Sequence, residues 1–239
     1  MKFSVVLPCY NEERYLKEAV TKIEAALSGI EYEIIIVDDG STDRTLREAL
    51  LLEAQGRVKL ISYAMNKGKG EAIIIGLRAA IGEAVGHIDG DLDISPERLL
   101  AYIKALDSAD IAVASKRHQD SVIEWTVERR FLSWGFQKFI KVMVGIDVSD
   151  TQTGMKVARR ESIERSLPFL AVKRYAFDVE LLTVARLMDM KVIEFPIELS
   201  LTSSFGTRNI GSIFIEVLGI AYRLRIKHWY QKAIKLREV

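Results

Sequence analysis

Three aspartates alternate with other residues in segment 87–93 (HIDGDLD), directly after an apolar run. Residues i and i+2 of an extended chain point the same way, with Cα atoms roughly 6.5 Å apart. Asp89 and Asp91 can therefore share one cation, and Asp93 can reach it directly or through water. Like charges this close need a positive partner, and hard oxygen ligands favour Mg²⁺ or Mn²⁺ with a bound diphosphate. The alternative is a solvated loop that caps the following helix, but Ser95 already supplies that cap.

Polar segments follow three further apolar runs, and each carries groups suited to a nucleotide. The segments are 8–12 (PCYNE), 38–43 (DDGSTD) and 66–70 (NKGKG). Carboxylates in 38–43 can accept hydrogen bonds from ribose hydroxyls or base N–H groups, although the same residues suit a turn with a helix cap. The glycines and lysines of 66–70 can cradle a phosphate before a helix. That segment matches neither the dinucleotide fingerprint nor the P-loop, so it is a weak signal alone.

The elements that must position these segments alternate between short apolar runs and longer helical patterns. Runs typical of strands buried on both faces span 3–7, 33–37, 58–62, 84–88 and 111–114. Apolar residues at helical spacing predict helices over 16–27, 42–54, 70–81 and 96–106. This alternation predicts an α/β fold with a mostly parallel central sheet and helices on both faces. Ligands bind beyond the carboxyl ends of such strands, so the four polar segments should meet along one edge.

Composition excludes several classes of protein. The 239 residues suffice for one large core, and the hydrophobic (49%) and charged (28%) fractions are those of a folded globular protein. A net charge of +1 gives no reason to expect a nucleic-acid partner. The single cysteine, Cys9, is compatible with a reducing compartment. The sequence shows neither a secretory signal nor a run of about 20 apolar residues, so we expect a cytoplasmic protein whose membrane contact is peripheral.

Six motifs occur in an order that resembles a known enzyme family. Along the chain they read SVVLPCYNEE, VDDGSTD, NKGKGEA, DGDLD, DTQTGMKVARR and FDVELL. The set resembles the family-2 inverting glycosyltransferases of the GT-A fold, and within them the polyprenyl-phosphate sugar synthases of the dolichyl-phosphate mannose synthase type. The resemblance covers about residues 1–208 and implies a GT-A glycosyltransferase domain there. A C-terminal basic amphipathic helix is expected over residues 209–239.

The resemblance implies a nucleotide-sugar donor, GDP-mannose or UDP-glucose, bound with Mg²⁺ or Mn²⁺. Asp89 and Asp91 would be the metal ligands, joined by Asp93, where many such synthases carry Gln. The sugar or acceptor pocket would be lined by residues that otherwise form a turn, namely Gln152, Thr153 and Gly154. Donor contacts are implied for Pro8, Tyr10, Glu12, Val37, Asp38, Asp39, Lys67, Gly68, Asp89, Gly90 and Asp91.

The acceptor implied by the resemblance is dolichyl or polyprenyl phosphate. A phosphate monoester has a second pKa of about 6, so this nucleophile is already ionised at neutral pH. Its difficulty is approaching a second anion, and arginine is suited to hold it because the guanidinium binds phosphate bidentately. We expect this role for Arg117, Arg130 and, by position alone, Arg208, against the alternative of solvated helix faces. Asp178 and Glu180 would position the acceptor or act as a base; the alternative is a favourable pair at a helix N-terminus.

The C-terminal residues suit a membrane interface. From Ile213 onward an apolar stripe recurs at alternating three- and four-residue spacing, with basic residues off the stripe, and a second apolar face follows Arg129 and Arg130. A basic amphipathic helix with Trp and Tyr can lie among lipid headgroups, but both faces can equally pack on the domain or form a dimer. The stripe comprises Ile215, Leu218, Tyr222, Ile226, Trp229, Ala233 and Leu236, and the second face Leu132, Phe136, Phe139, Ile140 and Met143.

The sequence therefore predicts a metal-dependent inverting hexosyltransferase, with mannose favoured over glucose, at the cytoplasmic face of a membrane. Alternatives are a family-2 enzyme acting on a glycan or soluble alcohol, and a non-catalytic nucleotide-sugar binding protein. A nucleotidyltransferase would carry a Gly-rich basic loop after the first strand, where this chain has PCYNEE. Either a homodimer or a membrane-subunit partner is compatible with the chain. The expected catalytic residues are Asp89, Asp91, Arg117, Arg130, Asp178 and Glu180.

Overall fold

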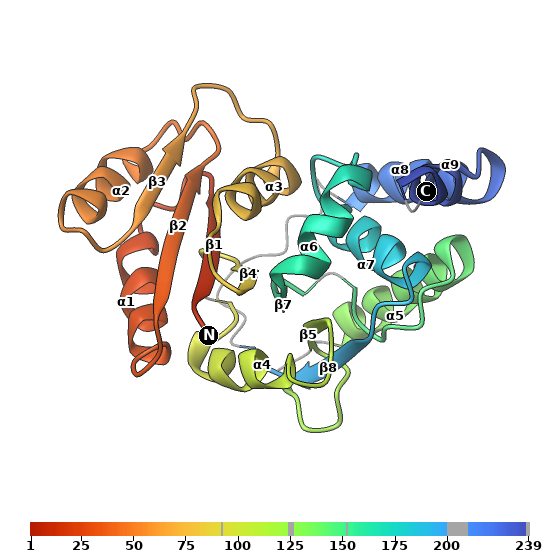
Figure 1. Cartoon of the computed structure of the whole chain (residues 1–239), viewed down its shortest axis with the longest axis horizontal. Helices are drawn as coiled ribbons and strands as arrows, with labels where there is room; N and C mark the ends of the chain where they lie inside the picture. The colour runs from red at the N-terminus through yellow and green to blue at the C-terminus, as the bar shows by residue number, and fades with distance from the viewer. Residues whose placement is uncertain (92, 124–126, 152, 200–209, 238–239) are drawn as a thin grey trace.

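The computed structural model describes residues 1–91, 93–123, 127–151, 153–199 and 210–237, with the backbone alone for 127–132, 198, 199 and 210. Its strands are β1 (Phe3–Cys9), β2 (Tyr32–Asp38), β3 (Lys59–Ser62), β4 (Ala84–Ile88), β5 (Ile111–Ser115), β6 (Val122–Ile123), β7 (Met155–Arg159), β8 (Val192–Pro196) and β9 (Glu198–Leu199). Seven of them form a sheet in the order β3-β2-β1-β4-β7-β5-β8 (Figure 1). The remaining two, β6 and β9, pair with each other. Within the large sheet only β7 is antiparallel to its neighbours. The predicted mostly parallel sheet is confirmed.

Helices cover both faces of the large sheet, as the sequence predicts. On one face lie α1 (Leu16–Ala26), α2 (Thr45–Ala54) and α4 (Leu99–Ala105); on the other lie α3 (Lys69–Ala79), α5 (Val127–Val144), α6 (Arg160–Ser166), α7 (Phe177–Leu187) and α8 (Ile210–Ala221). Figure 1 shows α1 and α2 on one side of the first strands and α3 on the other. Shorter or later elements are the 3₁₀ helices η1 (Pro96–Arg98) and η2 (Leu167–Phe169), the π-helical segment η4 (Tyr222–Ile226) and α9 (Trp229–Arg237).

Strand β1 shows why an apolar run becomes a buried strand. Successive side chains of a strand point to opposite faces of the sheet. Val5 and Leu7 therefore join the core beneath α1, while Val6 joins the core that contains α3, and all three are fully buried. The predicted burial of the third strand on both faces is wrong. Lys59 and Ser62 are exposed because β3 lies at the edge of the sheet, next to β2.

The strand order creates a crevice between β1 and β4. The chain builds β1, β2 and β3 in one direction along the sheet and then crosses back to place β4 on the other side of β1. In open α/β sheets, ligands bind beyond the carboxyl ends of the strands at such a point of reversal. The segment after β1 and the aspartates after β4 therefore converge at this crevice.

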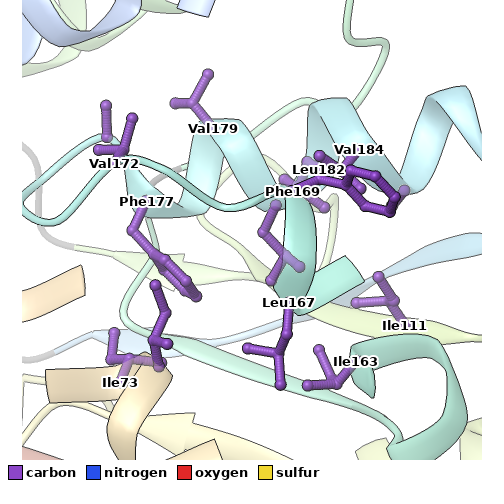
Figure 2. Close-up of a cluster of buried hydrophobic side chains, with 14 of the residues drawn as sticks. Ile73, Ile111, Ile163, Leu167, Phe169, Val172, Phe177, Val179, Leu182 and Val184 are labelled. Atoms are coloured by element: carbon purple, nitrogen blue, oxygen red, sulfur yellow. The ribbon is translucent and has the colours of Figure 1, made fainter. Parts of the chain in front are cut away.

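Helix α7 is a central helix, and its residues 177–185 are all buried. In Figure 2, Phe177 and Leu182 lie among apolar side chains from α3, α6 and η2. An interior helix offers its polar side chains no water, and an unpaired buried charge is strongly destabilising. Asp178 and Glu180 must therefore find partners within the protein.

The C-terminal segment is not the single helix that the apolar stripe predicts. α8 passes into η4, and the chain then turns at His228, which has a left-handed φ of 50°. α9 runs back against α7 and η2, where Tyr230 and Ile234 are buried. Burial of these two side chains accounts for the turn, and it divides the stripe between two helices.

The C-terminal helices share the core of the rest of the chain. Val217 and Ile220 of α8 are fully buried in the cluster that contains α7. The domain boundary predicted after residue 208 falls outside the described residues. Among the helices that the structure describes, none combines the length and apolarity needed to cross a membrane.

Candidate active site

A cavity of about 260 Å³ lies at the carboxyl ends of β1, β2 and β4. All four polar segments that the sequence places at this edge contribute to its wall, which confirms the predicted convergence. The loop before α7 also contributes, through two residues that the sequence analysis missed. The lining residues are Pro8, Cys9, Tyr10, Glu12, Asp39, Asn66, Gly68, Lys69, Ala72, Asp89, Gly90, Asp91, Arg174 and Tyr175.

Three carboxylates, those of Glu12, Asp89 and Asp91, crowd one wall of this cavity. Burial, together with the charges of Asp91 and Asp89, raises the pKa of Glu12 to about 7. Burial and the charge of Asp89 raise the pKa of Asp91 to about 6. Burial is the larger cause of both shifts, and the neighbouring carboxylates add to it because like charges disfavour one another's ionisation. A divalent cation would remove this repulsion, so the residues present fit Mg²⁺ or Mn²⁺.

The aspartate triplet of the sequence does not form a three-ligand site. Asp93 lies outside the cavity wall, and its backbone N–H donates to Asp91 Oδ1 at 3.1 Å. Among the residues that the structure describes, no three His, Cys, Asp or Glu side chains are grouped to hold a metal ion. Asp89 and Asp91 remain, and Mg²⁺ in proteins commonly uses one or two carboxylates plus substrate phosphates.

Lys69, the first residue of α3, places a cation beside these aspartates. Its Nζ lies 2.7 Å from the Asp89 carboxylate. Burial alone would lower the pKa of Lys69, but Asp89, Asp178 and Asp91 together outweigh burial and the pKa is raised. The sequence analysis chose Lys67 instead, which is exposed and has its Nζ over the Tyr63 ring. The structure begins α3 at Lys69, one residue before the predicted start. A helical side chain leans toward the helix N-terminus, so the exact start of the helix was the signal that could have selected Lys69.

The N-terminus of α3 is occupied by protein groups, which corrects the phosphate cradle expected from segment 66–70. The Asp39 carboxylate accepts hydrogen bonds from the N–H groups of Lys67 (2.7 Å) and Gly68 (2.9 Å). The N–H groups of residues 70 and 71 donate to carbonyls of the loop before α7, at 3.1 and 2.9 Å. The Lys69 side chain, rather than the backbone, is the positive group that this segment brings to the cavity.

Asp38 forms a turn rather than a donor contact. It is buried, and its carboxylate accepts from the Ser41 N–H (3.2 Å) and the Ser62 hydroxyl (3.0 Å). Val37 is fully buried within the core. Of the predicted donor contacts, the cavity wall contains Pro8, Tyr10, Glu12, Asp39, Gly68, Asp89, Gly90 and Asp91, and it does not contain Val37, Asp38 or Lys67.

Asp178, at the start of α7, lies in a buried ion-pair network rather than at the cavity. Its Oδ1 is 2.9 Å from Lys156 Nζ and 3.4 Å from His87 Nε2. The register of β4 with β7 pairs His87 with Lys156, so both side chains reach α7 from one point of the sheet. Burial alone would raise the pKa of Asp178, but Lys156 and His87 outweigh it and hold that pKa well below its ordinary value. This position gives no support to the acceptor-side role expected for Asp178.

Glu180 is fully buried, and all of its acceptor capacity faces protein donors. Its Oε1 accepts from Arg223 Nη2 at 2.9 Å and from the Tyr230 hydroxyl. Its Oε2 accepts from the N–H groups of Ala171 (2.7 Å) and Val172 (2.6 Å). These contacts give no support to the acceptor-side role expected for Glu180.

Gly154 supports Asp89 from behind instead of lining the cavity. Its carbonyl accepts from the Asp89 N–H at 3.0 Å, and a Cβ at this position would lie 1.9 Å from Asp89 Oδ2. Any side chain would therefore displace the carboxylate. Thr153 is buried, and its carbonyl accepts from Lys156 Nζ at 2.8 Å. Gln152 lies outside the described residues.

Of the three arginines expected to bind the acceptor phosphate, the structure describes the side chain of Arg117. Arg117 follows β5, is exposed, and donates from Nη2 to the Ser133 hydroxyl of α5 at 3.2 Å. Arg130 belongs to α5, but its side chain lies outside the described residues, as does all of Arg208. The structure therefore locates one of the three, away from the donor cavity wall.

The fold and the acidic crevice define a class, the GT-A glycosyltransferases. Residues 4–167 match the model described as glycosyl transferase family 2, and the chain belongs to that family. The expectation drawn from the six motifs is thus confirmed at the level of the family.

Two curated relatives extend over most of the chain. The dolichol-phosphate mannosyltransferase of Pyrococcus furiosus is 31% identical over 233 residues, covering 94% of this chain and 64% of its own length. The dolichyl-phosphate beta-glucosyltransferase of Mus musculus is 31% identical over 215 residues, covering 81% of this chain and 65% of its own length. The chain therefore spans slightly less than two thirds of the length of these relatives.

Solved structures agree with the fold. The glucosyl-3-phosphoglycerate synthase of Mycobacterium tuberculosis in complex with uridine diphosphate has a TM-score of 0.69 at 22% identity, covering 92% of this chain and 79% of its own. Its complex with Mn²⁺, uridine diphosphate and phosphoglyceric acid has a TM-score of 0.70, also at 22% identity, covering 92% and 77%. At this identity the likeness establishes the fold.

Proposed function

We propose that this protein transfers a hexose from a nucleotide sugar to dolichyl or polyprenyl phosphate, with a divalent cation at the donor diphosphate. The observation that carries the proposal is the uncompensated acidic wall of the cavity between β1 and β4. Support for the acceptor comes from the relatives, whose names describe a dolichol-phosphate mannosyltransferase and a dolichyl-phosphate beta-glucosyltransferase. These names support mannose or glucose as the sugar, and GDP-mannose or UDP-glucose as the donor.

On the donor side, the proposal assigns a role to each kind of group in the cavity. Asp89 and Asp91 would hold Mg²⁺ or Mn²⁺, which when bound stabilises the charge of a departing diphosphate as a Lewis acid. Lys69, which pairs with Asp89 here, would add positive charge beside the phosphates. Arg174 is exposed at the cavity wall and suits a phosphate oxygen, because a guanidinium donates in a fork. The half-exposed ring of Tyr10 suits stacking on the base.

On the acceptor side, the buried acids favour a phosphate nucleophile over an alcohol. An alcohol acceptor needs a general base within hydrogen-bond reach. Of the carboxylates that the sequence offers for this task, Asp178 is buried in ion pairs and Glu180 is buried in hydrogen bonds. A phosphate monoester is already ionised and needs no base. Arg117, and by sequence position Arg130 and Arg208, would hold that phosphate.

Peripheral membrane contact is part of the proposal, and the outward face of the C-terminal helices supports it. Ile215 and Ile226 are 72% and 68% exposed, and Trp134 of α5 is also exposed. α5 and α8 form one continuous surface, since Phe136 and Phe139 of α5 pack on the Phe214 ring at 5.1 and 4.7 Å between centroids. Apolar side chains beside basic ones suit the headgroup region of a bilayer. The chain would then work at the cytoplasmic face of a membrane.

The test is a screen of labelled GDP-mannose and UDP-glucose against polyprenyl phosphate, free polyprenol and a soluble alcohol, with and without Mn²⁺. We expect transfer to polyprenyl phosphate alone, from one donor, and only with the metal. Transfer to an alcohol instead would establish the alternative acceptor class. Nucleotide binding without transfer to any acceptor would overturn the proposal in favour of a binding protein.

A further inference from the structure

Residues 171–176, here called the pre-α7 loop, connect the donor cavity to the C-terminal helices. Arg174 and Tyr175 at the middle of this loop line the cavity. Neither belongs to a motif that identifies the family in this sequence. The loop has no helix or strand hydrogen bonds of its own, so the groups that hold its backbone help to set where these two side chains lie.

The carbonyl groups of the loop are held by the N-terminus of α3. Lys173 O accepts from the Glu71 N–H at 2.9 Å, and Arg174 O accepts from the Gly70 N–H at 3.1 Å. The approach is close enough that a Cβ at Gly68 would lie 2.6 Å from Lys173 O, and one at Gly70 would lie 2.9 Å from Arg174 O. Glycine is therefore required at both positions for the loop to reach the cavity.

The N–H groups of the loop are held by carboxylates. Those of Ala171 and Val172 donate to Glu180, whose other oxygen is bound by Arg223 of η4. At the far end, the Ala176 N–H donates to Glu216 Oε2 of α8 at 2.8 Å. The C-terminal helices thus supply one carboxylate directly and hold the second through an arginine.

Of the two carboxylates that hold the loop, Glu216 is the one whose contact lies next in sequence to the cavity-lining side chains. Its partner, Ala176, directly follows Tyr175 and is fully buried, so loss of this hydrogen bond leaves a buried N–H without an acceptor. Lys173 and Arg174 are exposed and contribute little packing to resist a shift of the loop. A change at position 216 should therefore be transmitted to Tyr175 and Arg174.

We infer that Glu216 is a positioning residue for donor binding: by accepting the Ala176 N–H it fixes Arg174 and Tyr175 at the nucleotide cavity. The inference rests on the proposed function, because it takes the cavity as the donor site. It follows that α8, which does not line the cavity, contributes to donor affinity. The same helix carries the exposed Ile215 and Leu218, so the donor site and the outward face share one rigid element.

The experiment measures binding of UDP and GDP in the presence of Mn²⁺ by calorimetry, using the full chain. In Glu216→Ala we expect about tenfold weaker binding of the nucleotide that the wild type binds, since a charge-assisted hydrogen bond is lost. Glu216→Gln keeps an acceptor oxygen and should bind within about twofold of the wild type. Val217→Ala is the matched control, because it removes buried packing from the same helix and leaves the Ala176 contact in place.

Each outcome decides the inference. Equal nucleotide affinity in Glu216→Ala and the wild type would overturn it and leave the proposed function standing. The inference would also be overturned if Val217→Ala and Glu216→Ala lost nucleotide affinity in the same proportion to their loss of melting temperature. That result would show an effect of stability only. A wild type that binds neither nucleotide would overturn both proposals. Glu216→Met keeps the side-chain length without the oxygens and replaces the alanine variant if that variant does not fold.

Discussion

The cavity wall and helix α7 each hold a group of acids, but the two groups are neutralised to different extents. Lys69 pairs with Asp89 alone in the cavity, whereas both acids of α7 have a cationic partner, Lys156 or Arg223. Glu12 and Asp91 are half-buried among further carboxylates, and their pKa values are raised to about 7 and about 6. Asp178 is more deeply buried, yet Lys156 and His87 overcome that burial and hold its pKa well below the ordinary value. Burial alone therefore does not distinguish a functional acid from a structural one. The number of cationic and N–H partners does, and the group with fewer partners is the one to which the proposed function assigns the metal.

The largest expected effect comes from removing a cavity acid. Asp91→Ala should lower transfer by about a hundredfold or more, because metal-assisted charge stabilisation is worth several kcal/mol. The melting temperature should stay constant or rise, since the substitution relieves repulsion with Asp89 and Glu12. A transfer assay and thermal denaturation measure the two effects. Undiminished transfer in this variant, or full wild-type activity in excess EDTA, would disprove the metal assignment.

Removing a cationic partner of Asp178 should instead lower the stability of the fold. Lys156→Ala leaves the buried Asp178 without its closest cation and should cost about 3–5 kcal/mol of unfolding free energy. Adding Asp178→Asn should recover part of that loss. Chemical denaturation measures both variants. The control is Lys141→Ala, which breaks the exposed pair with Asp147 and should change the free energy of unfolding little. A similar cost for both lysines would contradict the comparison.

The pH dependence of metal binding and of stability tests the acids of the cavity and the acid of α7 together. Protons compete with the cation at Glu12 and Asp91, so Mn²⁺ affinity should rise as pH increases through 6 and 7, by up to about tenfold per unit for each proton released. Raised folded-state pKa values also mean that these acids stabilise the metal-free fold at low pH and lose that contribution as pH rises through 6 to 7. Asp178 has a lowered pKa, so its contribution is lost only in strong acid. Calorimetry and melting curves between about pH 5 and 8 check both signs; flat Mn²⁺ affinity over that range would contradict the assignment.

The smallest effect is expected at the outward face of the C-terminal helices. The full chain should float with anionic vesicles at low salt, and Lys227→Ser should weaken binding by about 1 kcal/mol, the usual attraction of one basic residue near a charged surface. Lys17→Ser on α1, at the opposite end of the molecule in Figure 1, is the control. Failure of the wild type to float, or an equal effect of both substitutions, would remove membrane contact from the proposed function.

Local patterns predict the strands and acids of the cavity well. β1, β2 and β4 are apolar runs whose side chains enter two cores, and the polar residues that follow them end at one edge by geometry. The alternation of Asp89 and Asp91 after β4 is equally local, so their joint place in the cavity is predictable. These features need no knowledge of distant residues.

The site features that the sequence could not predict depend on residues far apart in the chain or on an exact helix boundary. Glu180 looks like a free acid in FDVELL because its partners Arg223 and Tyr230 lie 43 and 50 residues further along the chain. Lys67 and Lys69 differ only in which side of the helix start they occupy, and that boundary decides which of them reaches Asp89. Arg174 belongs to none of the six motifs, and it reaches the cavity because the pre-α7 loop is hydrogen-bonded to the N-terminus of α3.

The antiparallel strand β7 has a consequence for the order in which the site is assembled. β1 to β4 come from residues 3–88, whereas β7 must be synthesised much later and then inserted beside β4, with Met155 opposite Ile88. Pairing between distant segments is slow because the loop must close before any contact forms, and N-terminal segments fold first during synthesis. We therefore expect the acidic edge to stay open on the nascent chain until residues 153–159 leave the ribosome. Only then can the Gly154 carbonyl accept the Asp89 N–H and fix the carboxylate in place.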